Sequence, residues 1–324
     1  MKPGVYRGLA MADYLAMPAV SASILKTIIA ECPQKARHES WLNPDLKISD
    51  ATKASDTGSV AHGILLEGSE AGVEVIDPED HPADKTGNIP TGWTNKSIKA
   101  ARDAAIEDGK IPILVADMET IRAMVSEARR YLDEEVRPLE PAIWAAFQPD
   151  GGESETTIVW DEDGTLCRIR PDRLSADRKL VIDYKTTKTS AEPDRWGRTQ
   201  MVGMGYYTSA AFYSRGIHAT FGHEPAYCYL VQEQDAPFLC SLVGVDPHGL
   251  ELGAAKIAYG LALWQACAKS GRWPGYPGRV CYPEIPQWED ARWMEREASD
   301  FVANLPADRG KMLSAADLDS GIPG

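Results

Sequence analysis

The chain has 324 residues, enough for one large domain or two small ones around a substantial buried core. Hydrophobic residues make up 44% and charged residues 25%, an ordinary globular composition. The formal net charge of −14 argues against a protein that merely coats nucleic acid, because such proteins are usually basic. Any contact with DNA must therefore be local or assisted by bound cations.

No stretch of the sequence is typical of a targeting or membrane segment. Residues 1–15 have no long apolar core and no small-residue cleavage site, so we expect no signal peptide. The most apolar late stretch, residues 250–267, contains Glu251 and Lys256 and falls short of the roughly 18 uncharged residues that a membrane span needs. We expect a soluble, cytoplasmic protein with no membrane contact.

The six cysteines include no CxxC pair and lack the dense spacing of a disulfide framework. We therefore expect reduced thiols. An iron–sulfur cluster needs four clustered thiolates, and this spacing gives no sign of them. We expect no such cluster.

The first part of the chain reads as helical. Residues 19–33 predict an amphipathic helix that Ser21 or Ser23 caps and Pro33 ends. A long surface loop is expected where Pro, Gly, Asp and Lys gather, and its role is open between a lid, a subunit contact and disorder. This loop covers residues 78–98. Two further helices are predicted, one over residues 58–67 and one over residues 117–133.

From residue 156 onward the pattern changes to alternating apolar and polar residues, with turn-like DEDG and SADR separators. It predicts a three-stranded meander, followed by a helix, two strands and a long helix. The class is therefore α/β or α+β, with a central mixed β-sheet flanked by helices. The strands of the meander cover residues 156–160, 166–173 and 180–185. The helix that follows covers 199–214, the two strands cover 227–231 and 239–245, and the long helix covers 247–269.

Three residues of the meander carry groups suited to metal-dependent chemistry. Asp172 and Asp183 are eleven residues apart, which suits neighbouring strands of a hairpin, and Lys185 shares a face with Asp183. Two carboxylates can hold Mg²⁺, and a lysine beside them can orient a water or stabilise a developing oxyanion. The alternative is a surface ion pair on a solvated strand. The apolar run Leu180–Ile182 that leads into Asp183 favours a site at the sheet end.

The same residues resemble a known motif. Pro171-Asp172 followed by Asp183-Tyr184-Lys185 is similar to the PD-(D/E)XK nuclease signature. The sequence RPDRL…IDYKTT resembles that of the RecE-like branch, exodeoxyribonuclease VIII, which is related to RecB-type nuclease domains. The resemblance implies that Asp172 and Asp183 bind Mg²⁺, with Mn²⁺ as a substitute. It also implies a ligand from the Tyr184 carbonyl and a role for Lys185 on the attacking water.

Two further segments match in the expected order. GSVAHGILLE places His62 where related nucleases have a histidine that reaches the metal, although a lone histidine on an apolar helix is more often a satisfied core residue. In ESETTIVW, Glu155 fits a further acidic position of the family better than Glu153, by its spacing to Trp160. A solvated strand charge is the alternative for Glu155.

Two helices supply candidate DNA contacts. SASILKTIIAECP resembles the family's N-terminal S-x-S-x-L…CP helix, in which Ser21 and Ser23 either touch DNA or cap a core helix. GYYTSAAFYSRG resembles the GYxxQAAxY helix, where Tyr213 matches as a contact to the scissile strand or as a core tyrosine. Ser209 stands at the usual glutamine position, and Gln200, nine residues earlier, would face the opposite side of one helix.

Basic residues are concentrated around the candidate site. Residues 168–198 contain nine basic and five acidic side chains, a local balance of +4. Because phosphate contacts need Lys and Arg at the groove only, Arg170, Arg195 and Arg198 are candidate DNA contacts. Arg195 or Arg198 is also a candidate for binding a 5′-phosphate. The alternative is that the arginines of these strands pair with the acidic remainder.

The resemblance covers about residues 19–288 and implies one nuclease domain over residues 1–288. Its helical part would span 1–135 and its catalytic sheet core 136–288, before an acidic, loosely ordered tail over 289–324. It further implies 5′-to-3′ degradation of linear double-stranded DNA for homologous recombination by a ring-shaped homo-oligomer. A RecT-like single-strand annealing partner and a phage or prophage source belong to the same implication.

Three other functions remain open. The first is a catalytically silent module that binds DNA ends or protein, although such a module has no chemical need for both aspartates and the lysine. The second is a nuclease of CRISPR adaptation or a repair complex, against which the missing cysteine cluster argues. The third is a restriction endonuclease, which would need base-reading elements that we do not find.

Overall fold

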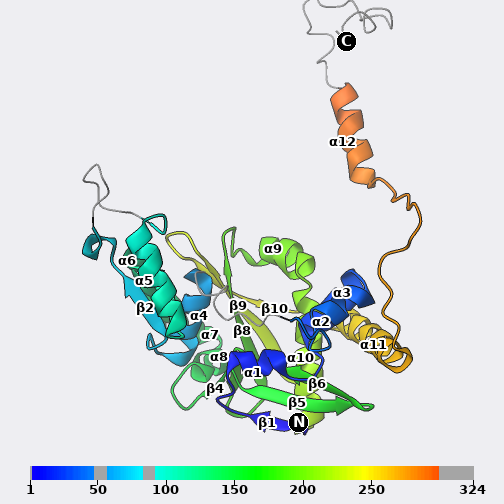
Figure 1. Ribbon diagram of the computed structural model, residues 1–324, viewed down its shortest axis with the longest axis horizontal. Coiled ribbons are helices and arrows are strands. Elements are labelled where there is room, and N and C mark those ends of the chain that lie inside the picture. Colours follow the sequence, from blue (N-terminus) through cyan, green and yellow to red (C-terminus); the bar gives the residue numbers. More distant parts are fainter. Residues whose placement is uncertain (1, 47–56, 83–91, 299–324) are drawn as a thin grey trace, which may run out of the picture. The chain divides into compact units, whose positions relative to one another are not determined.

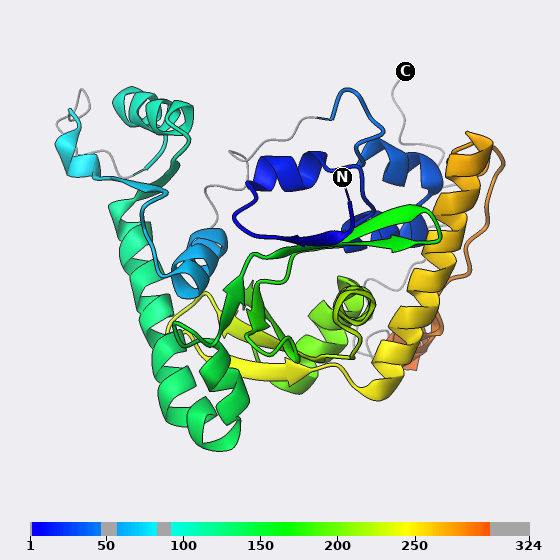
Figure 2. The same cartoon turned by 90° about the horizontal axis from the view of Figure 1, so that it is seen from below.

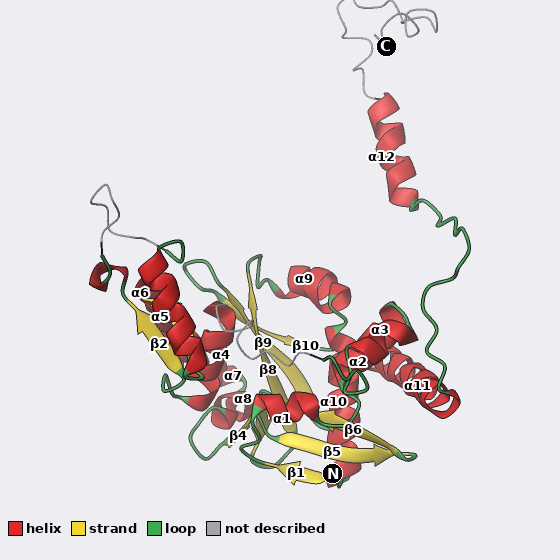
Figure 3. Ribbon diagram, in the orientation of Figure 1, coloured by secondary structure: helices red, strands yellow, loops and turns green. Residues whose placement is uncertain are grey.

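A mixed five-stranded sheet forms the centre of Met1–Gly275, the larger of the two units into which the chain divides. The computed structural model describes residues 2–46, 57–82 and 92–298. In spatial order the strands of this sheet are β10 (Cys240–Gly244), β9 (Ala226–Glu233), β8 (Leu180–Thr187), β7 (Arg173–Ser175) and β4 (Gly152–Ser154) (Figure 3). β8 and β9 run parallel, and the other three pairs are antiparallel. The predicted mixed α/β class is therefore confirmed.

The predicted three-stranded meander is wrong, because its strands belong to two sheets. β5 (Thr157–Glu162) and β6 (Thr165–Ile169) form an antiparallel sheet with β1 (Gly4–Tyr6). After Ile169 the chain leaves this sheet, and Pro171, which has no N–H to donate to a ladder, lies in the break. The next strand, β7, then pairs with β8 in the central sheet.

The N-terminal part is not purely helical. Besides β1, it contains the parallel pair β2 (Val73–Ile76) and β3 (Ile111–Leu114). The stretch expected as a loop over residues 78–98 lies partly outside the described residues, and its described ends carry a short 3₁₀ helix and the start of a helix. The shorter elements of this unit are α1 (Met11–Ala16), η1 (Pro78–Asp80), α5 (Lys96–Glu107), η2 (Leu132–Val136), α7 (Arg137–Leu139) and α8 (Pro141–Ala146).

Helices cover both faces of the central sheet (Figure 1, Figure 2). On one face, α4 (Thr57–Glu67) and α6 (Val115–Tyr131) form an apolar cluster with Ile182 and Tyr184 of β8. On the other face, α2 (Ala22–Ala30), α10 (Tyr206–Phe221) and α11 (Pro247–Ser270) pack with Val181. Alternate residues of β8 therefore face two separate cores, as the pleat of a strand requires.

The helix α2 begins as the sequence predicts and ends earlier. Ser21 is its N-cap, and the Ser21 hydroxyl accepts a hydrogen bond from the Ile24 N–H over 3.4 Å. The helix stops at Ala30, and Pro33 is the first residue of a separate helix, α3 (Pro33–His38). A proline fits this first position because the N–H that it lacks has no helical partner there.

The single helix predicted over residues 199–214 is wrong. The chain forms α9 (Pro193–Trp196) and the π-turn η3 (Gly197–Met201), and then breaks at Gly205 before α10 begins. Gly205 has a φ of 63°, a left-handed conformation that glycine adopts without steric cost. Gln200 and Ser209 therefore lie on different elements, and their spacing in helical turns has no meaning.

The second unit, Tyr276–Gly324, contains α12 (Gln287–Ala298), in a region where the sequence predicted a loosely ordered tail. Large apolar side chains of this helix, among them Trp288 and Trp293, are exposed. The rest of the predicted tail, residues 299–324, lies outside the described residues, and the predicted boundary at residue 288 stays a prediction. Across the described ranges, no helix combines the length and the apolarity that crossing a membrane requires.

Candidate metal centre

The two aspartates and the lysine of the motif lie side by side. Asp172 directly precedes β7, and the antiparallel pairing of Arg173 with Ile182 brings it beside Asp183 on β8. The Tyr184 N–H donates to Asp172 Oδ2 over 2.9 Å. Lys185 Nζ forms an ion pair with Asp183 Oδ1 and lies 3.7 Å from Asp172 Oδ2. The expectation that Asp183 and Lys185 share a face therefore holds.

A histidine joins this group from another element. α4 packs against β8 and carries His62, whose Nε2 lies 3.0 Å from Asp172 Oδ2 and 3.8 Å from Glu155 Oε1. Burial alone would lower the pKa of His62, but the charges of Asp172 and Glu155 raise it. The side chain therefore points into the acidic group rather than into the apolar core.

Glu155 reaches the same point from a turn, not from a strand as the sequence suggested. It lies between β4 and β5 with a φ of 53°, and its N–H donates to the Pro171 carbonyl over 3.1 Å. Arg170 Nε donates to Glu155 Oε2 over 2.5 Å, which fixes the carboxylate. Glu153 instead binds Arg7 and Arg178, away from this group.

The arrangement fits a divalent cation. One ligand atom each from His62, Glu155 and Asp172 lies within 4.8 Å of the others. Asp183 Oδ1 is buried, and among the described residues its partner is the Lys185 ammonium. The same ammonium also lies near Asp172, so one positive charge faces two buried carboxylates, and a bound cation would compensate the remaining negative charge. Carboxylate oxygens with one imidazole form a donor set that Mg²⁺, Mn²⁺ and related ions accept.

The charges around the two aspartates move their pKa values in opposite directions. Burial would raise the pKa of Asp172, but Lys185 and then His62 lower it well below its usual range. Burial, and then the Asp172 charge, raise the pKa of Asp183 to about 6. Burial would lower the pKa of Lys185, but Asp183 and Asp172 raise it. Lys185 is therefore an ammonium at neutral pH and acts as a fixed positive charge.

The backbone of Tyr184 lies beside this cluster, while its side chain does not. The Tyr184 hydroxyl donates to Gln232 on the opposite face of the sheet, where Tyr184 joins the cluster of α4 and α6. The N–H contact with Asp172 places the Tyr184 peptide next to the candidate metal ligands. A ligand role for its carbonyl stays a prediction.

Two of the candidate DNA contacts, Ser21 and Tyr213, are buried or partly buried in the fold, whereas Ser23 is exposed. Ser21 caps α2, and the Ser21 and Ser23 hydroxyls lie 2.8 Å apart. The Tyr213 ring is partly buried, and its hydroxyl donates to the Arg170 carbonyl over 3.3 Å. These positions support the alternative structural roles for Ser21 and Tyr213. Whether any of the three touches DNA is not shown by these contacts.

The arginines of the strands do not form an open basic surface, contrary to the expectation from local charge. Arg168 and Arg173 are buried and donate to backbone carbonyls, including those of Met17 and Ala146. Arg170 binds Glu155 and the Leu9 carbonyl, and Arg178 binds Glu153. The guanidinium groups thus tie the two sheets to neighbouring segments. Arg195 on α9 and Arg198 on η3 are exposed, as a phosphate contact would require.

The sequence reasoning missed two tyrosines of this site. The Tyr227 hydroxyl donates to Asp183 Oδ2 over 2.9 Å, and the Tyr206 ring centroid lies 5.8 Å from Lys185 Nζ. The tyrosines at 227 and 229 alternate in an otherwise apolar strand, which was the available signal. Which strand is the parallel neighbour of β8 cannot be read from spacing, so the contact stayed hidden.

Together, the mixed sheet and the clustered carboxylates, histidine and lysine define a PD-(D/E)XK-like protein. The chain belongs to the family described as "PDDEXK-like domain of unknown function (DUF3799)", whose model matches residues 21–284. No curated protein matches the sequence.

One solved structure shares the fold at low sequence identity. The crystal structure of a "Putative exonuclease" from Eubacterium rectale is similar with a TM-score of 0.51 at 11% identity, over 87% of this chain and 96% of that one. At this identity the similarity concerns the fold alone. The structure of SSO0001 matches over 63% of this chain and 85% of that one at 10% identity, and its TM-score of 0.24 supports no argument.

Proposed function

We propose that this protein is a metal-dependent exodeoxyribonuclease that degrades linear double-stranded DNA. The observation that carries the proposal is the convergence of His62, Glu155 and Asp172, from three separate elements, beside the Asp183–Lys185 pair. A purely structural ion pair would not need three further titratable groups around it. Membership of a PDDEXK-like family supports the proposed nuclease reaction, and so does the name "Putative exonuclease" of the Eubacterium rectale protein.

Mg²⁺ is the proposed cation, and Mn²⁺ can substitute for it. The side chains of Asp172, Asp183 and His62 would hold the cation, and the backbone carbonyl of Tyr184 would be a further ligand. When bound, it would supply positive charge at the scissile phosphate and lower the pKa of an attacking water. Glu155 contributes further negative charge to the same site.

Lys185 is the catalytic group that this chain itself provides. Its ammonium is held between Asp183 and Asp172, where it can orient the attacking water and stabilise the charge that develops on the phosphate. Arg170 positions Glu155, and Tyr227 positions Asp183. None of these side chains needs to change its protonation state to perform these roles at neutral pH.

The finer parts of the proposal concern the substrate and its setting. We propose 5′-to-3′ polarity, single-stranded tails for homologous recombination, a ring-shaped homo-oligomer and a RecT-like annealing partner in the cytoplasm of a phage-infected or prophage-bearing bacterium. Ser21, Ser23, Arg170, Tyr213, Arg195 and Arg198 are the proposed DNA contacts. Of these residues, Ser23, Arg195 and Arg198 are exposed, so solvent and a phosphate can reach their side chains.

A catalytically silent module that binds DNA ends or protein is the second candidate. Ser209 favours it, because the family's glutamine position holds a short side chain that is buried in α10. Without an amide there, one contact to the scissile strand would be missing.

The test is to incubate the protein with linear and covalently closed circular double-stranded DNA, with and without Mg²⁺. Asp183→Asn removes one carboxylate charge from the site, and Asp103→Asn removes one from the surface of α5, where the Asp103 side chain is 60% exposed. We expect degradation of linear DNA alone, dependent on the cation and lost only in Asp183→Asn. Cutting of the circle would indicate an endonuclease, and no cutting in Mg²⁺ or Mn²⁺ would indicate the silent module.

A further inference from the structure

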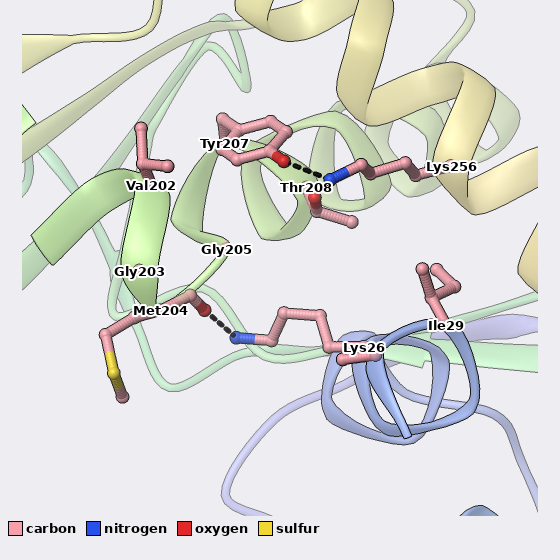
Figure 4. Close-up of a pocket in the computed structure, with 10 residues that line it drawn as sticks. Lys26, Ile29, Val202, Gly203, Met204, Gly205, Tyr207, Thr208 and Lys256 are labelled. Carbon is pink, nitrogen blue, oxygen red and sulfur yellow. Dashed lines mark hydrogen bonds between the residues drawn. The ribbon is translucent and has the colours of Figure 1, made fainter. Parts of the chain in front are cut away.

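A cavity of about 170 Å³ lies between α2, α10 and α11 (Figure 4). It is well above the roughly 10–15 Å³ that one water needs. Its lining residues come from the break before α10, from the first turn of α10, and from the facing sides of the other two helices. They are Lys26, Ile29, Ala30, Val202, Gly203, Met204, Gly205, Tyr207, Thr208 and Lys256.

The charge of this cavity is unlike that of the chain. Two lysines, Lys26 and Lys256, line it, and none of its described lining residues is an aspartate or a glutamate. The chain as a whole has a net charge of −14. Asp183 of the neighbouring site acts on Lys26 from outside the lining, but inside this partly enclosed space the two ammonium groups attract an anion.

Both lysines are held with their ammonium groups at the cavity wall (Figure 4). Lys26 Nζ donates to the Met204 carbonyl over 3.1 Å, and Lys256 Nζ donates to the Tyr207 hydroxyl. Each of these contacts uses one of the three N–H groups of an ammonium, so donors remain for a ligand. Burial, and then the charge of Lys185, lower the pKa of Lys26. A neighbouring anion would raise this pKa again.

The backbone at the start of α10 also attracts an anion to the cavity. α10 has sixteen residues, and its N-cap Gly205 supplies no side-chain cap, so the N–H groups of the first turn lack helical partners at this end. A Cβ on Gly205 would lie 3.3 Å from Lys26 Cδ, so glycine leaves room for the lysine. Gly253 of α11 would place a Cβ 2.7 Å from the Tyr207 carbonyl, so this glycine lets α11 approach α10 closely.

The cavity adjoins the site of the proposed reaction. Lys26 Nζ lies 5.6 Å from the Tyr206 ring centroid, and Lys185 Nζ lies 5.8 Å from the same centroid. The cavity lysine and the catalytic lysine thus both lie near one aromatic ring, and the charge of Lys185 acts on Lys26. A nucleic-acid strand with its scissile phosphate at Lys185 would have another of its phosphates within reach of Lys26.

We propose that this cavity is a second phosphate-binding subsite, in which Lys26, Lys256 and the first turn of α10 hold a phosphate of the DNA strand that is being cut. The proposal rests on the proposed nuclease function for the identity of the strand. The ligand chemistry is a phosphate monoester or diester, which the strand's 5′ end or its backbone can supply.

Lys26→Gln, Lys256→Gln and the double variant remove the charges while they keep a polar end and part of each aliphatic stem. Lys26→Arg restores a charge, and Lys269→Gln is the matched control, because Lys269 is exposed near the far end of the same helix, α11. The first measurement is thermal unfolding in EDTA, with inorganic phosphate against chloride at equal ionic strength. We expect phosphate to raise the melting temperature of the wild type, Lys26→Arg and Lys269→Gln, and not that of the double variant.

The second measurement is fluorescence anisotropy of a labelled duplex in EDTA, with a 5′-phosphate or a 5′-hydroxyl end. We expect the double variant to bind DNA roughly tenfold or more weakly, since hydrogen bonds to charged groups are among the strong ones. The slope of log affinity against log salt should become shallower by about one to two units. Loss of a preference for 5′-phosphate assigns the subsite to the strand end, and equal loss on both duplexes assigns it to the backbone.

Wild-type DNA affinity, salt slope and phosphate stabilisation in the double variant would overturn the subsite. Phosphate stabilisation that depends on the lysines, without any DNA binding by the wild type, would overturn its assignment to DNA. Lysine-dependent DNA binding by a protein that cuts no DNA would leave the subsite standing and contradict the nuclease function. The two proposals therefore fail on different measurements.

Discussion

The Tyr227 hydroxyl donates a hydrogen bond to Asp183 Oδ2 over 2.9 Å, from one parallel strand to the next. The donor helps to hold the carboxylate that also pairs with Lys185. Tyr229, two residues further along β9, donates instead to the Tyr206 carbonyl. One strand therefore carries two buried tyrosines; Tyr227 gives its hydroxyl hydrogen bond to a candidate metal ligand, and Tyr229 gives its own to a backbone carbonyl.

Tyr227→Phe should weaken the binding of Mg²⁺ or Mn²⁺ by about tenfold, because groups that orient metal ligands typically have effects of this size. The loss of one hydrogen bond should cost about 1 kcal/mol of stability. Isothermal titration calorimetry measures the metal affinity. Tyr229→Phe is the matched control and should keep the wild-type affinity. An equal loss in both variants would mean that the hydroxyl of Tyr227 has no special role.

Metal binding should release protons. The pKa of His62 is raised by Asp172 and Glu155 against the effect of burial, and that of Asp183 is raised to about 6 by burial and by Asp172. Below these values each group holds a proton that an incoming cation must displace, so the affinity should rise with pH and level off above both pKa values. Calorimetry in two buffers with different ionisation enthalpies measures the protons released. A metal affinity that is constant from pH 5 to pH 8 would contradict this linkage.

Lys185→Gln should separate metal binding from catalysis. Without the ammonium, the pKa values of Asp172 and Asp183 rise, because Lys185 lowers both. At alkaline pH, where both carboxylates are ionised, no ammonium competes with a divalent cation, so we expect the variant to bind the cation at least as tightly as the wild type. Cleavage of linear DNA should fall by about 10²-fold or more, as for other losses of a group that stabilises developing charge. If cleavage survives, Lys185 only neutralises the carboxylates.

The two glutamates of the ESET segment should behave differently. Glu155→Gln should lower the metal affinity by about ten- to a hundredfold, whereas Glu153→Gln should not change it. The hydrogen bond from Arg7, followed by that from Arg178, lowers the pKa of Glu153 from 4.5 to about 2. A carboxyl with a lowered pKa stabilises the fold above its unfolded pKa and loses this contribution as the pH falls towards about 2.

Urea unfolding against pH measures the second half of this prediction. Wild type and Glu153→Gln should differ in stability at pH 7 and converge as the pH falls below 4. A difference that does not change between pH 7 and pH 3 would show that the ion pairs of Glu153 contribute nothing measurable.

Gly216→Ala should destabilise the fold by about 1–3 kcal/mol. A Cβ at this position of α10 would lie 2.7 Å from Trp160 Cζ3 and 2.9 Å from Ile169 Cδ1, where α10 contacts the sheet of β1, β5 and β6. Gly63→Ala is the control, since a Cβ there meets no atom within 4 Å and alanine favours a helix. Urea denaturation measures both, and an unchanged midpoint for Gly216→Ala would mean that this contact relaxes without cost.

The sequence predicted the elements that local patterns determine. α4, β8 and α11 lie within a few residues of their predicted bounds, because their periodicity and caps are local properties. A cap at Ser21 or Ser23 was predicted for the same reason, and Ser21 is the residue that caps the helix. The side-by-side position of Asp183 and Lys185 follows from the two-residue repeat of a strand, and so it too was predictable.

Features that depend on distant partners were not predictable. The break at Pro171 sends β6 and β7 into different sheets, which alternation alone cannot indicate. The local charge of +4 suggested a DNA surface, but Arg168 and Arg173 are used on backbone carbonyls. Their acceptors lie far along the chain, so only the folded structure reveals that these charges are unavailable to DNA.

The register of β8 limits how this protein can change. Its pleat places Ile182 and Tyr184 in one apolar cluster and Asp183 on the other face. Inserting or deleting a single residue in the turn at residues 176–179 would move the strand by one position and exchange the two faces. A deletion would bring Tyr184, and an insertion Ile182, to the position of Asp183 at the site, and both charged residues would enter the apolar cluster. We therefore expect this turn to accept substitutions of residue type but not changes of length.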